Sequence, residues 1–226
     1  MDIFQPNKKH IKDIKFPAFI IKNGNATADW IMDSGIPEIN LIEYCKKFLD
    51  SDSCLVDIGA HMGTYSIMLA RHCKKVYAYE AQRITYYQLC GNIALNKRYN
   101  VHAYNYGICD EGDFLRALFV TSEDGGGSTF IPQNKSIQTE YVEMKMLDSF
   151  SFEKIGLIKI DIEGYELKAL KGAIKTLDKH NYPPILFESN NDDKERKELI
   201  EFLNNLGYSV ERTQLQYNMF LAIKNV

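Results

Sequence analysis

Short apolar runs alternate with amphipathic stretches along most of the chain, which is the pattern of an α/β protein. The apolar runs predict strands over residues 54–58, 76–79, 101–106, 157–162 and 185–188. Helical spacing predicts helices over residues 39–49, 64–72, 86–95, 165–177 and 193–206. This alternation predicts a largely parallel, doubly wound sheet, which a hairpin of residues 208–210 and 220–223 completes.

Two regions depart from the alternation. Residues 114–120 and 141–147 predict strands that enclose the glycines at 125–127, which are too flexible for a strand interior. These glycines form either the tip of a hairpin or a loop that closes over a bound ligand. Residues 1 to about 35 look irregular, apart from a short strand at residues 16–21 that Pro17 keeps at a sheet edge.

The composition fits one compact protein. The chain has 226 residues, 45% hydrophobic and 25% charged, which is enough for a sizeable core. The net charge of −3 shows no excess of basic residues, so we expect no nucleic-acid partner.

The cysteines and the apolar runs bear on the compartment. The five cysteines lack Cys-x-x-Cys spacing, which indicates free thiols in a reducing compartment. No apolar run reaches the roughly 18 residues of a membrane span. The first residues lack the order of a signal peptide, and we expect a cytoplasmic location.

The stretch from Leu55 to Ser66 gives the clearest chemical signal. An apolar strand runs directly into Gly59 and Gly63, and a helical pattern follows at once. Such a turn lets the backbone lie against a ligand at the carboxyl end of the first strand of a doubly wound sheet. The Gly-x-x-x-Gly spacing departs from the Gly-x-Gly-x-x-Gly of dinucleotide sites. It favours S-adenosylmethionine (SAM), which has no pyrophosphate.

Acidic residues near this turn are candidate cofactor ligands. Glu80 ends the second predicted strand about 20 residues after Gly59, where an acid meets ribose hydroxyls in such sites. The alternative is a solvated strand-end glutamate. Asp57 lies inside an apolar strand and needs partners, for which the amides of the turn and an amino group of the cofactor are candidates. We expect His61 to pack or cap rather than to catalyse, and Ala81 and Gln82 to lie near the adenine. The candidate cofactor-binding residues are Asp57, Gly59, Ala60, His61, Gly63, Thr64, Glu80, Ala81, Gln82 and Gly107.

A second centre lies at the fourth predicted strand, where charged residues interrupt the apolar run. Alternate residues of a strand share a face, so Lys159 and Asp161 point the same way. In one interpretation the two neutralise each other, and Glu163 and Glu166 complement the dipole of the following helix. In the other, the charges bind a ligand at the carboxyl end of the sheet. Glu188 ends the next predicted strand and could reach the same pocket.

These motifs, in this order, resemble those of FkbM-type methyltransferases over about residues 50–190. The matching segments are Val56–Gly63, Tyr79–Ala81, Asn92–Asn96, Leu147–Phe150, Ile158–Glu166, Leu170–Ala173 and Ile185–Glu188. The resemblance implies a class I methyltransferase (Rossmann-like) fold, with a mostly parallel seven-stranded sheet whose last strand is antiparallel. It implies SAM as the cofactor and methyl transfer to a hydroxyl of a sugar in a glycan or glycolipid. We expect a SAM-binding domain over residues 46–226 and an N-terminal extension, residues 1–45, packed on it.

The implied reaction assigns candidate catalytic roles. A sugar hydroxyl is a weak acid, so a base or a metal is expected near it. Asp161 is the first candidate for the base, and Lys159 is the second if burial lowers its pKa. Glu188 or Glu163 would orient the acceptor. Asp161 and Glu188 could instead hold a divalent cation through oxygen ligands, although the sequence does not require one.

Other functions stay open at this point. An RNA ribose 2′-O-methyltransferase has a loosely similar arrangement of lysine and acids at strand ends, but the low net charge argues against it. A nicotinamide-binding oxidoreductase and a non-catalytic binding module with the SAM fold are further alternatives. The lone tryptophan, Trp30, either packs against the protein or stacks on a sugar ring.

Overall fold

The computed structural model describes residues 2–4, 17–21, 26–122, 125–189 and 193–225. Phe16, the first residue of the predicted N-terminal strand, lies outside these ranges. The strands are β1 (Asp2–Phe4), β2 (Phe19–Ile21), β3 (Cys54–Ile58), β4 (Lys75–Tyr79), β5 (Val101–Tyr104), β6 (Gly107–Ile108), β7 (Phe114–Val120), β8 (Gln138–Lys145), β9 (Ile155–Ile160), β10 (Ile185–Glu188), β11 (Tyr208–Arg212) and β12 (Met219–Lys224). The helices are α1 (Ala26–Ser34), α2 (Ile39–Cys45), α3 (Thr64–Leu69), α4 (Arg83–Leu95), α5 (Glu166–Lys171), α6 (Ile174–Lys179) and α7 (Asp193–Asn205).

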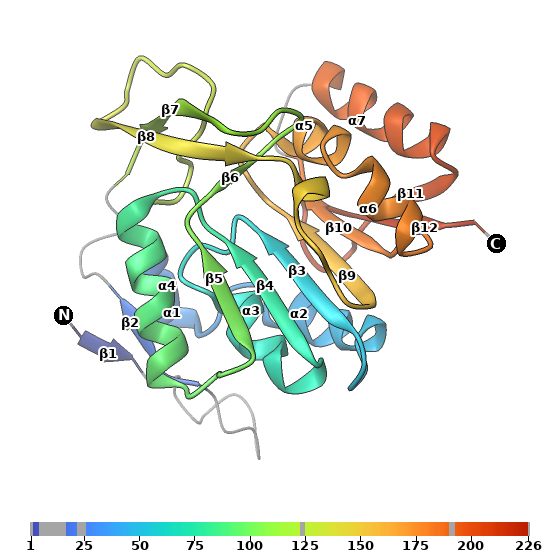
Figure 1. Cartoon of the computed structure of the whole chain (residues 1–226). Coiled ribbons are helices and arrows are strands. Elements are labelled where there is room, and N and C mark those ends of the chain that lie inside the picture. The colour runs from blue at the N-terminus through green and yellow to red at the C-terminus, as the bar shows by residue number, and fades with distance from the viewer. Residues whose placement is uncertain (1, 5–16, 22–25, 123–124, 190–192, 226) are drawn as a thin grey trace.

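A seven-stranded sheet forms the middle layer of the molecule, in the order β11-β12-β10-β9-β3-β4-β5 (Figure 1). The pairs from β10 to β5 are all parallel. The last strand, β12, runs antiparallel to both of its neighbours, β10 and β11. The predicted doubly wound sheet with one antiparallel last strand is confirmed.

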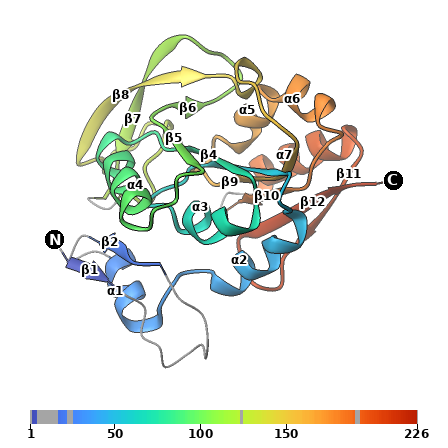
Figure 2. The same cartoon turned by 60° about the horizontal axis from the view of Figure 1, so that its bottom comes forward.

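Helices cover both faces of this sheet (Figure 2). Alternate residues of a strand point to opposite faces, so each central strand contributes to both layers. Leu55 of β3 packs with buried residues of α1, α2, α3 and α4. Its neighbour Val56 packs with buried residues of α5, α6 and α7 on the opposite face. Strands buried on both faces are apolar almost throughout, which is why the sequence shows them as continuous apolar runs.

A second, three-stranded sheet of order β6-β8-β7 stands over the carboxyl ends of the central strands (Figure 1). The strand predicted at residues 101–106 ends two residues earlier, because β5 stops at Tyr104 and the chain enters the second sheet only at Gly107. Asn105 lies where the chain leaves the central sheet. Its side chain donates hydrogen bonds to the carbonyl oxygens of Glu80 (2.8 Å) and Ala81 (2.9 Å).

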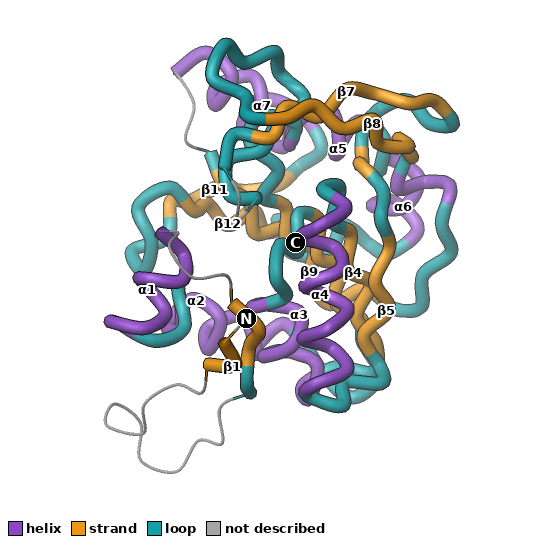
Figure 3. The backbone as a smooth tube through the Cα atoms, turned by 90° about the vertical axis from the view of Figure 1, so that its left-hand side faces the viewer, coloured by secondary structure: helices purple, strands orange, loops and turns teal. Residues whose placement is uncertain are grey.

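The N-terminal region is more regular than its sequence suggests, because its described parts form β1, β2 and α1. Side chains of α4 and of the residue that caps its end supply hydrogen-bond partners for the backbone of this segment. The amide of Ile20 donates to Asn92 Oδ1 (2.6 Å), and the amide of Ala18 donates to Asn96 Oδ1 (2.9 Å). The N-terminal hairpin therefore lies against α4 (Figure 3). A pattern of apolar residues alone could not reveal partners on a helix some seventy residues away.

The predicted helix at residues 165–177 is two helices, α5 and α6, which are separated at Gly172 and Ala173. A Cβ on Gly172 would lie 1.9 Å from the carbonyl oxygen of Cys109, so the end of α5 is pressed against that backbone. Asp148 accepts hydrogen bonds from the backbone amides of Lys175 (3.1 Å) and Thr176 (2.7 Å) and so caps α6. The apolar spacing continues across the break, which is why the sequence predicts one helix.

The other predicted helices agree with the structure within a few residues. The helices predicted at residues 39–49 and 64–72 each finish in a short 3₁₀ helix, Lys46–Phe48 and Ala70–His72 respectively. The strand predicted at 157–162 ends at Ile160, so the acids that follow it lie in a turn. Within the described part of the chain, none of the helices is both long and apolar enough to cross a membrane.

Gly172→Ala should lower the free energy of unfolding by about 2 kcal/mol or more, because the new methyl group meets backbone that cannot move aside. Gly91→Ala in α4 is the matched control, since its methyl group meets only the flexible end of Ile20. That variant should be neutral or up to about 1 kcal/mol more stable, because alanine favours a helix interior. Denaturant unfolding of both variants tests this, and equal stabilities would contradict it.

Candidate active site

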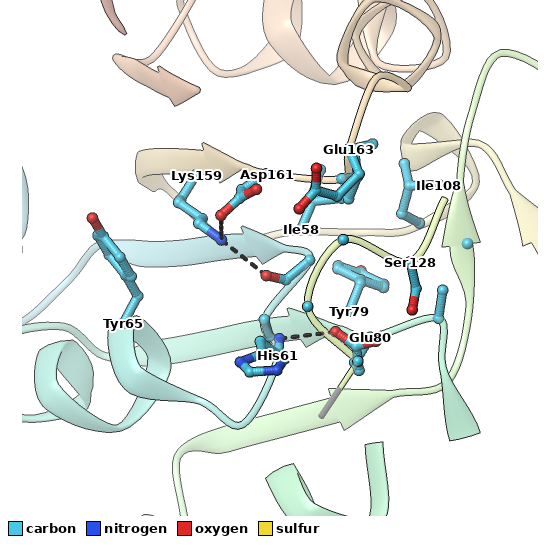
Figure 4. Close-up of a pocket in the computed structure, with 18 of the residues that line it drawn as sticks. Ile58, His61, Tyr65, Tyr79, Glu80, Ile108, Ser128, Lys159, Asp161 and Glu163 are labelled. Atoms are coloured by element: carbon cyan, nitrogen blue, oxygen red, sulfur yellow. Dashed lines mark hydrogen bonds and ion pairs between the residues drawn. The ribbon is translucent and has the colours of Figure 1, made fainter. Parts of the chain in front are cut away.

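A cavity of about 350 Å³ opens at the carboxyl ends of β3, β4 and β9 (Figure 4). The loop between β7 and β8 and the segment before α2 complete its wall. Ten of the predicted site residues line it: Gly59, Ala60, His61, Thr64, Glu80, Ala81, Gly107, Lys159, Asp161 and Glu163. Asp57, Gly63, Gln82 and Glu188 are not part of the lining. The volume is in the range of ordinary small-molecule sites.

The glycine turn after β3 is fixed by contacts on both sides. Gly59 has a φ of 77°, and a Cβ there would lie 1.8 Å from the carbonyl oxygen of Asp161. On the other side, the amides of Gly59 and Ala60 both donate to the carbonyl oxygen of Tyr79 (2.9 Å each). Gly63 has a φ of 96° and packs against Leu89 of α4, away from the cavity. Glycine at position 59 thus allows the loops after β3 and β9 to touch.

Glu80 is buried just after the end of β4, and each of its two carboxylate oxygens accepts a hydrogen bond from a backbone amide. Its Oε2 accepts from the amide of His61 (2.8 Å), and its Oε1 accepts from the amide of Gln82 (2.9 Å). Burial raises the pKa of Glu80, while the nearby His61 and these amides oppose that effect. Each oxygen keeps a lone pair for a further donor, which suits a diol. The Gln82 side chain instead accepts from the hydroxyls of Thr85 (3.2 Å) and Ser128 (3.3 Å).

Lys159 is the buried charge at the centre of the site. Its Nζ donates to the carbonyl oxygen of Gly59 (2.8 Å) and lies 3.3 Å from Asp161 Oδ2 and 3.7 Å from Asp57 Oδ1. Asp57 Oδ2 accepts a hydrogen bond from Ser66 (2.6 Å). The expectation that the glycine turn's amides solvate Asp57 is wrong, because Gly59 and the next residue donate to β4 instead.

The surroundings of Lys159 keep it protonated. Burial lowers the pKa of Lys159, but Asp161, Asp57 and Glu38 outweigh it and raise that pKa above its ordinary value. The suggestion that burial makes Lys159 a second candidate base is therefore wrong. Its position supports a structural and electrostatic role instead.

Three carboxyl groups meet beside this lysine. Asp161, Glu163 and Glu188 each offer an oxygen, and these oxygens lie within 4.8 Å of one another. Burial raises the pKa of Asp161, but Lys159 and a hydrogen bond with Glu188 outweigh it and hold that pKa below its ordinary value. Burial and the charge of Asp161 raise the pKa of Glu163. The three oxygens are also of the type that Mg²⁺ and Ca²⁺ bind.

The glycines between β7 and β8 lie over the cavity rather than projecting from a hairpin tip. Gly125, Gly126, Gly127 and Ser128 line it. The amide of Gly127 donates to the Glu163 carboxylate. The hydroxyl of Thr129 donates to the Glu163 carbonyl oxygen (2.7 Å). This loop is therefore docked on the turn that presents the catalytic candidates.

The segment before α2 contributes Glu38, which the sequence analysis missed. Glu38 precedes α2 with a φ of 54° and does not cap that helix with its side chain. It accepts a hydrogen bond from the hydroxyl of buried Tyr65 (2.5 Å), and both residues line the cavity. A positive φ at a residue other than glycine is strained and is common at functional sites. In the sequence, an acid just before a helix is too ordinary to single out.

Glu166, at the start of α5, clamps the turn that carries Asp161 and Glu163. Its Oε1 accepts from the amides of Ile162 (3.0 Å) and Gly164 (3.2 Å). Glu163 has a φ of 55° and Gly164 a φ of 97°. The clamp supports this strained backbone, which is a more specific role than complementing a helix dipole.

The buried carboxyl of Glu166 should make stability depend on pH. Burial raises the pKa of Glu166 from 4.5 to about 7. Between these values the unfolded chain releases a proton that the folded chain keeps. The free energy of unfolding should therefore fall as pH rises through this window, by about 3 kcal/mol. Glu166→Gln has no such proton and should remove this fall. Denaturant unfolding of both proteins across the window tests this, and parallel pH profiles would contradict it.

Comparison with known proteins finds methyltransferases both among family models and among individual relatives. The Methyltransferase FkbM domain model matches residues 57–210. Methyltransferase sdnD of Sordaria araneosa is 28% identical in an alignment 160 residues long, which covers 55% of this chain and 61% of that protein. Hexuronic acid methyltransferase AglP of Haloferax volcanii is 24% identical over 184 residues, which are 79% of this chain and 72% of that protein.

The crystal structure of methyltransferase FkbM from Methylobacillus flagellatus KT shares the fold, with a TM-score of 0.55 and 20% identity. The alignment covers 76% of this chain and 44% of that one. This chain thus spans less than two thirds of the sdnD and FkbM proteins. The family model, in contrast, covers more than half of the 226 residues. The protein belongs to the FkbM methyltransferase domain family.

Proposed function

We propose that the protein is a SAM-dependent O-methyltransferase that acts on a hydroxyl of a sugar in a glycan or glycolipid. One observation carries the proposal. A single cavity holds a carboxylate suited to a diol, Glu80, and a carboxylate held ionised by a buried lysine, Asp161 beside Lys159. Family membership supports methyl transfer, and the relative named as a hexuronic acid methyltransferase supports a sugar acceptor.

The lining of the cavity fits the methyl donor. Glu80 would accept hydrogen bonds from the ribose hydroxyls. Ile108, Leu118 and Phe130 supply an apolar surface for the adenine. Glu38 and Asp161 put negative charge where a sulfonium and an ammonium need it. When bound, SAM supplies an electrophilic methyl group on a sulfonium sulfur.

The protein's own part in the reaction is to place the acceptor and to receive its proton. Lys159 holds Asp161 ionised and Asp161 lines the cavity, so its carboxylate can accept the proton of the acceptor hydroxyl. Lys159 stabilises Asp161 in its charged form beforehand. Glu163 and Glu188 would orient the acceptor. Holding both reactants in this cavity supplies the proximity that an in-line displacement needs.

A divalent cation on Asp161, Glu163 and Glu188 is the alternative means of activating the hydroxyl. Labelled methyl transfer from SAM to a panel of hexose and deoxyhexose glycosides, with RNA alongside, tests both versions. Each acceptor is assayed with and without EDTA. Transfer to a glycoside supports the proposal, and its loss in EDTA assigns the role to a cation. Transfer to RNA alone would overturn the sugar acceptor.

Glu80→Gln should weaken binding of S-adenosylhomocysteine (SAH) by about 10- to 100-fold, because hydrogen bonds to a charged group contribute about 1.5–3 kcal/mol. Asp113→Asn is a matched control, because the Asp113 side chain is largely exposed and is not part of the cavity lining. Calorimetric titration of each variant measures the affinity, with thermal unfolding to confirm that the variant is folded. Unchanged affinity in a folded Glu80→Gln protein would remove Glu80 from the donor site.

Asp161→Asn should reduce kcat by at least about 100-fold while SAH still binds, because the amide cannot accept the proton. Asp113→Asn again serves as the control and should keep full turnover. Single-turnover methyl transfer measures the chemical step directly. Near-normal turnover in Asp161→Asn would show that Asp161 is not the base.

A further inference from the structure

Acids dominate the cavity wall on the side of the proposed proton acceptor. Glu38, Asp161 and Glu163 all line the cavity there, and they come from three separate segments of the chain. Among the described lining residues, Lys159 is the only lysine and there is no arginine. Its Nζ is already engaged by a carbonyl oxygen and two carboxylates. The described wall therefore offers no lysine or arginine to receive an anionic ligand.

The positive charge of the methyl donor does not cancel this excess of acids over bases in the cavity wall. SAM carries a sulfonium, an ammonium and a carboxylate, which leave one net positive charge. Lys159 adds one more, but Asp57 beneath it is a further buried acid. Donor and lysine together bring two positive charges to a wall that holds three acids, Glu38, Asp161 and Glu163, with Asp57 beneath it. A second carboxylate or a phosphate on the acceptor would enter against this field.

We propose that the acceptor is a sugar that carries no acidic group, either neutral or bearing an amine. In contrast to the relative named as a hexuronic acid methyltransferase, this protein would then reject uronic acids, and it would reject phosphorylated sugars as well. This inference rests on the proposed sugar methyltransferase activity, in the version in which Asp161 and not a divalent cation activates the hydroxyl. Trp30 fits the same acceptor, since it lies at the edge of the cavity with 48% of its surface exposed. A flat indole face packs well on the C–H face of an uncharged sugar ring.

Matched glycosides test the charge alone. The kcat/KM for methyl transfer is measured with glucosides, glucosaminides, glucuronides and glucuronamides, and with the corresponding galactose series. The uronate should be at least about 100-fold poorer than the uronamide, which has the same shape without the charge. Glu38→Gln should narrow that gap, whereas Asp113→Asn should not. Equal transfer to uronate and uronamide would overturn the proposal.

A second measurement decides the question if no glycoside in the panel is methylated. Sinefungin resembles SAH but carries an amine at the position of the transferred methyl group. It should bind at least about tenfold more tightly than SAH, and Glu163→Gln should reduce that advantage. Equal affinities for sinefungin and SAH would overturn the inference. A wild-type protein that binds neither compound would instead overturn the proposed methyltransferase function.

Discussion

The buried ammonium of Lys159 is the interaction on which the rest of the site depends. It joins the loop after β3, through the carbonyl oxygen of Gly59, to Asp161 after β9 and to Asp57 inside β3. Asp57 Oδ1 has no hydrogen bond of its own, so Lys159 is what offsets its charge. Removing one partner from such a buried group costs about 3–5 kcal/mol, because the others are left uncompensated. The same charge that stabilises the sheet also keeps Asp161 ionised. Stability and the proposed chemistry therefore depend on the same ion-pair cluster.

The N-terminal segment belongs to the site as much as to the fold. Asn92 of α4 accepts from the amide of Ile20 and donates to the carbonyl oxygen of Met62 in the glycine turn (2.9 Å). One buried amide side chain thus connects β2 to the glycine turn. Farther along, Glu38 reaches Tyr65 at the start of α3. Although the family model begins at residue 57, the segment before it supplies part of the cavity wall.

The central sheet was predictable because strands buried on both faces leave an unmistakable apolar pattern. Glu80, Lys159 and Asp161 could then be placed at the carboxyl end of that sheet. Charged residues in or beside apolar strands are costly to bury unless they are paired or bind a ligand, so they stand out in the sequence. Glu38 and the glycine loop could not be placed in the same way. Their positions depend on tertiary contacts, with Tyr65 in one case and Glu163 in the other. The direction of the Lys159 pKa also needed the structure, because it is set by how many acids surround the amine.

The central claim is that the cavity binds the methyl donor with its reactive end toward Asp161. A crystal structure of the protein with SAH tests this most directly. The account predicts the ribose hydroxyls on the Glu80 carboxylate, the adenine among the apolar residues near Ile108, and the sulfur facing Asp161. SAH bound elsewhere, or in this cavity with its ribose away from Glu80 and its sulfur turned from Asp161, would contradict it.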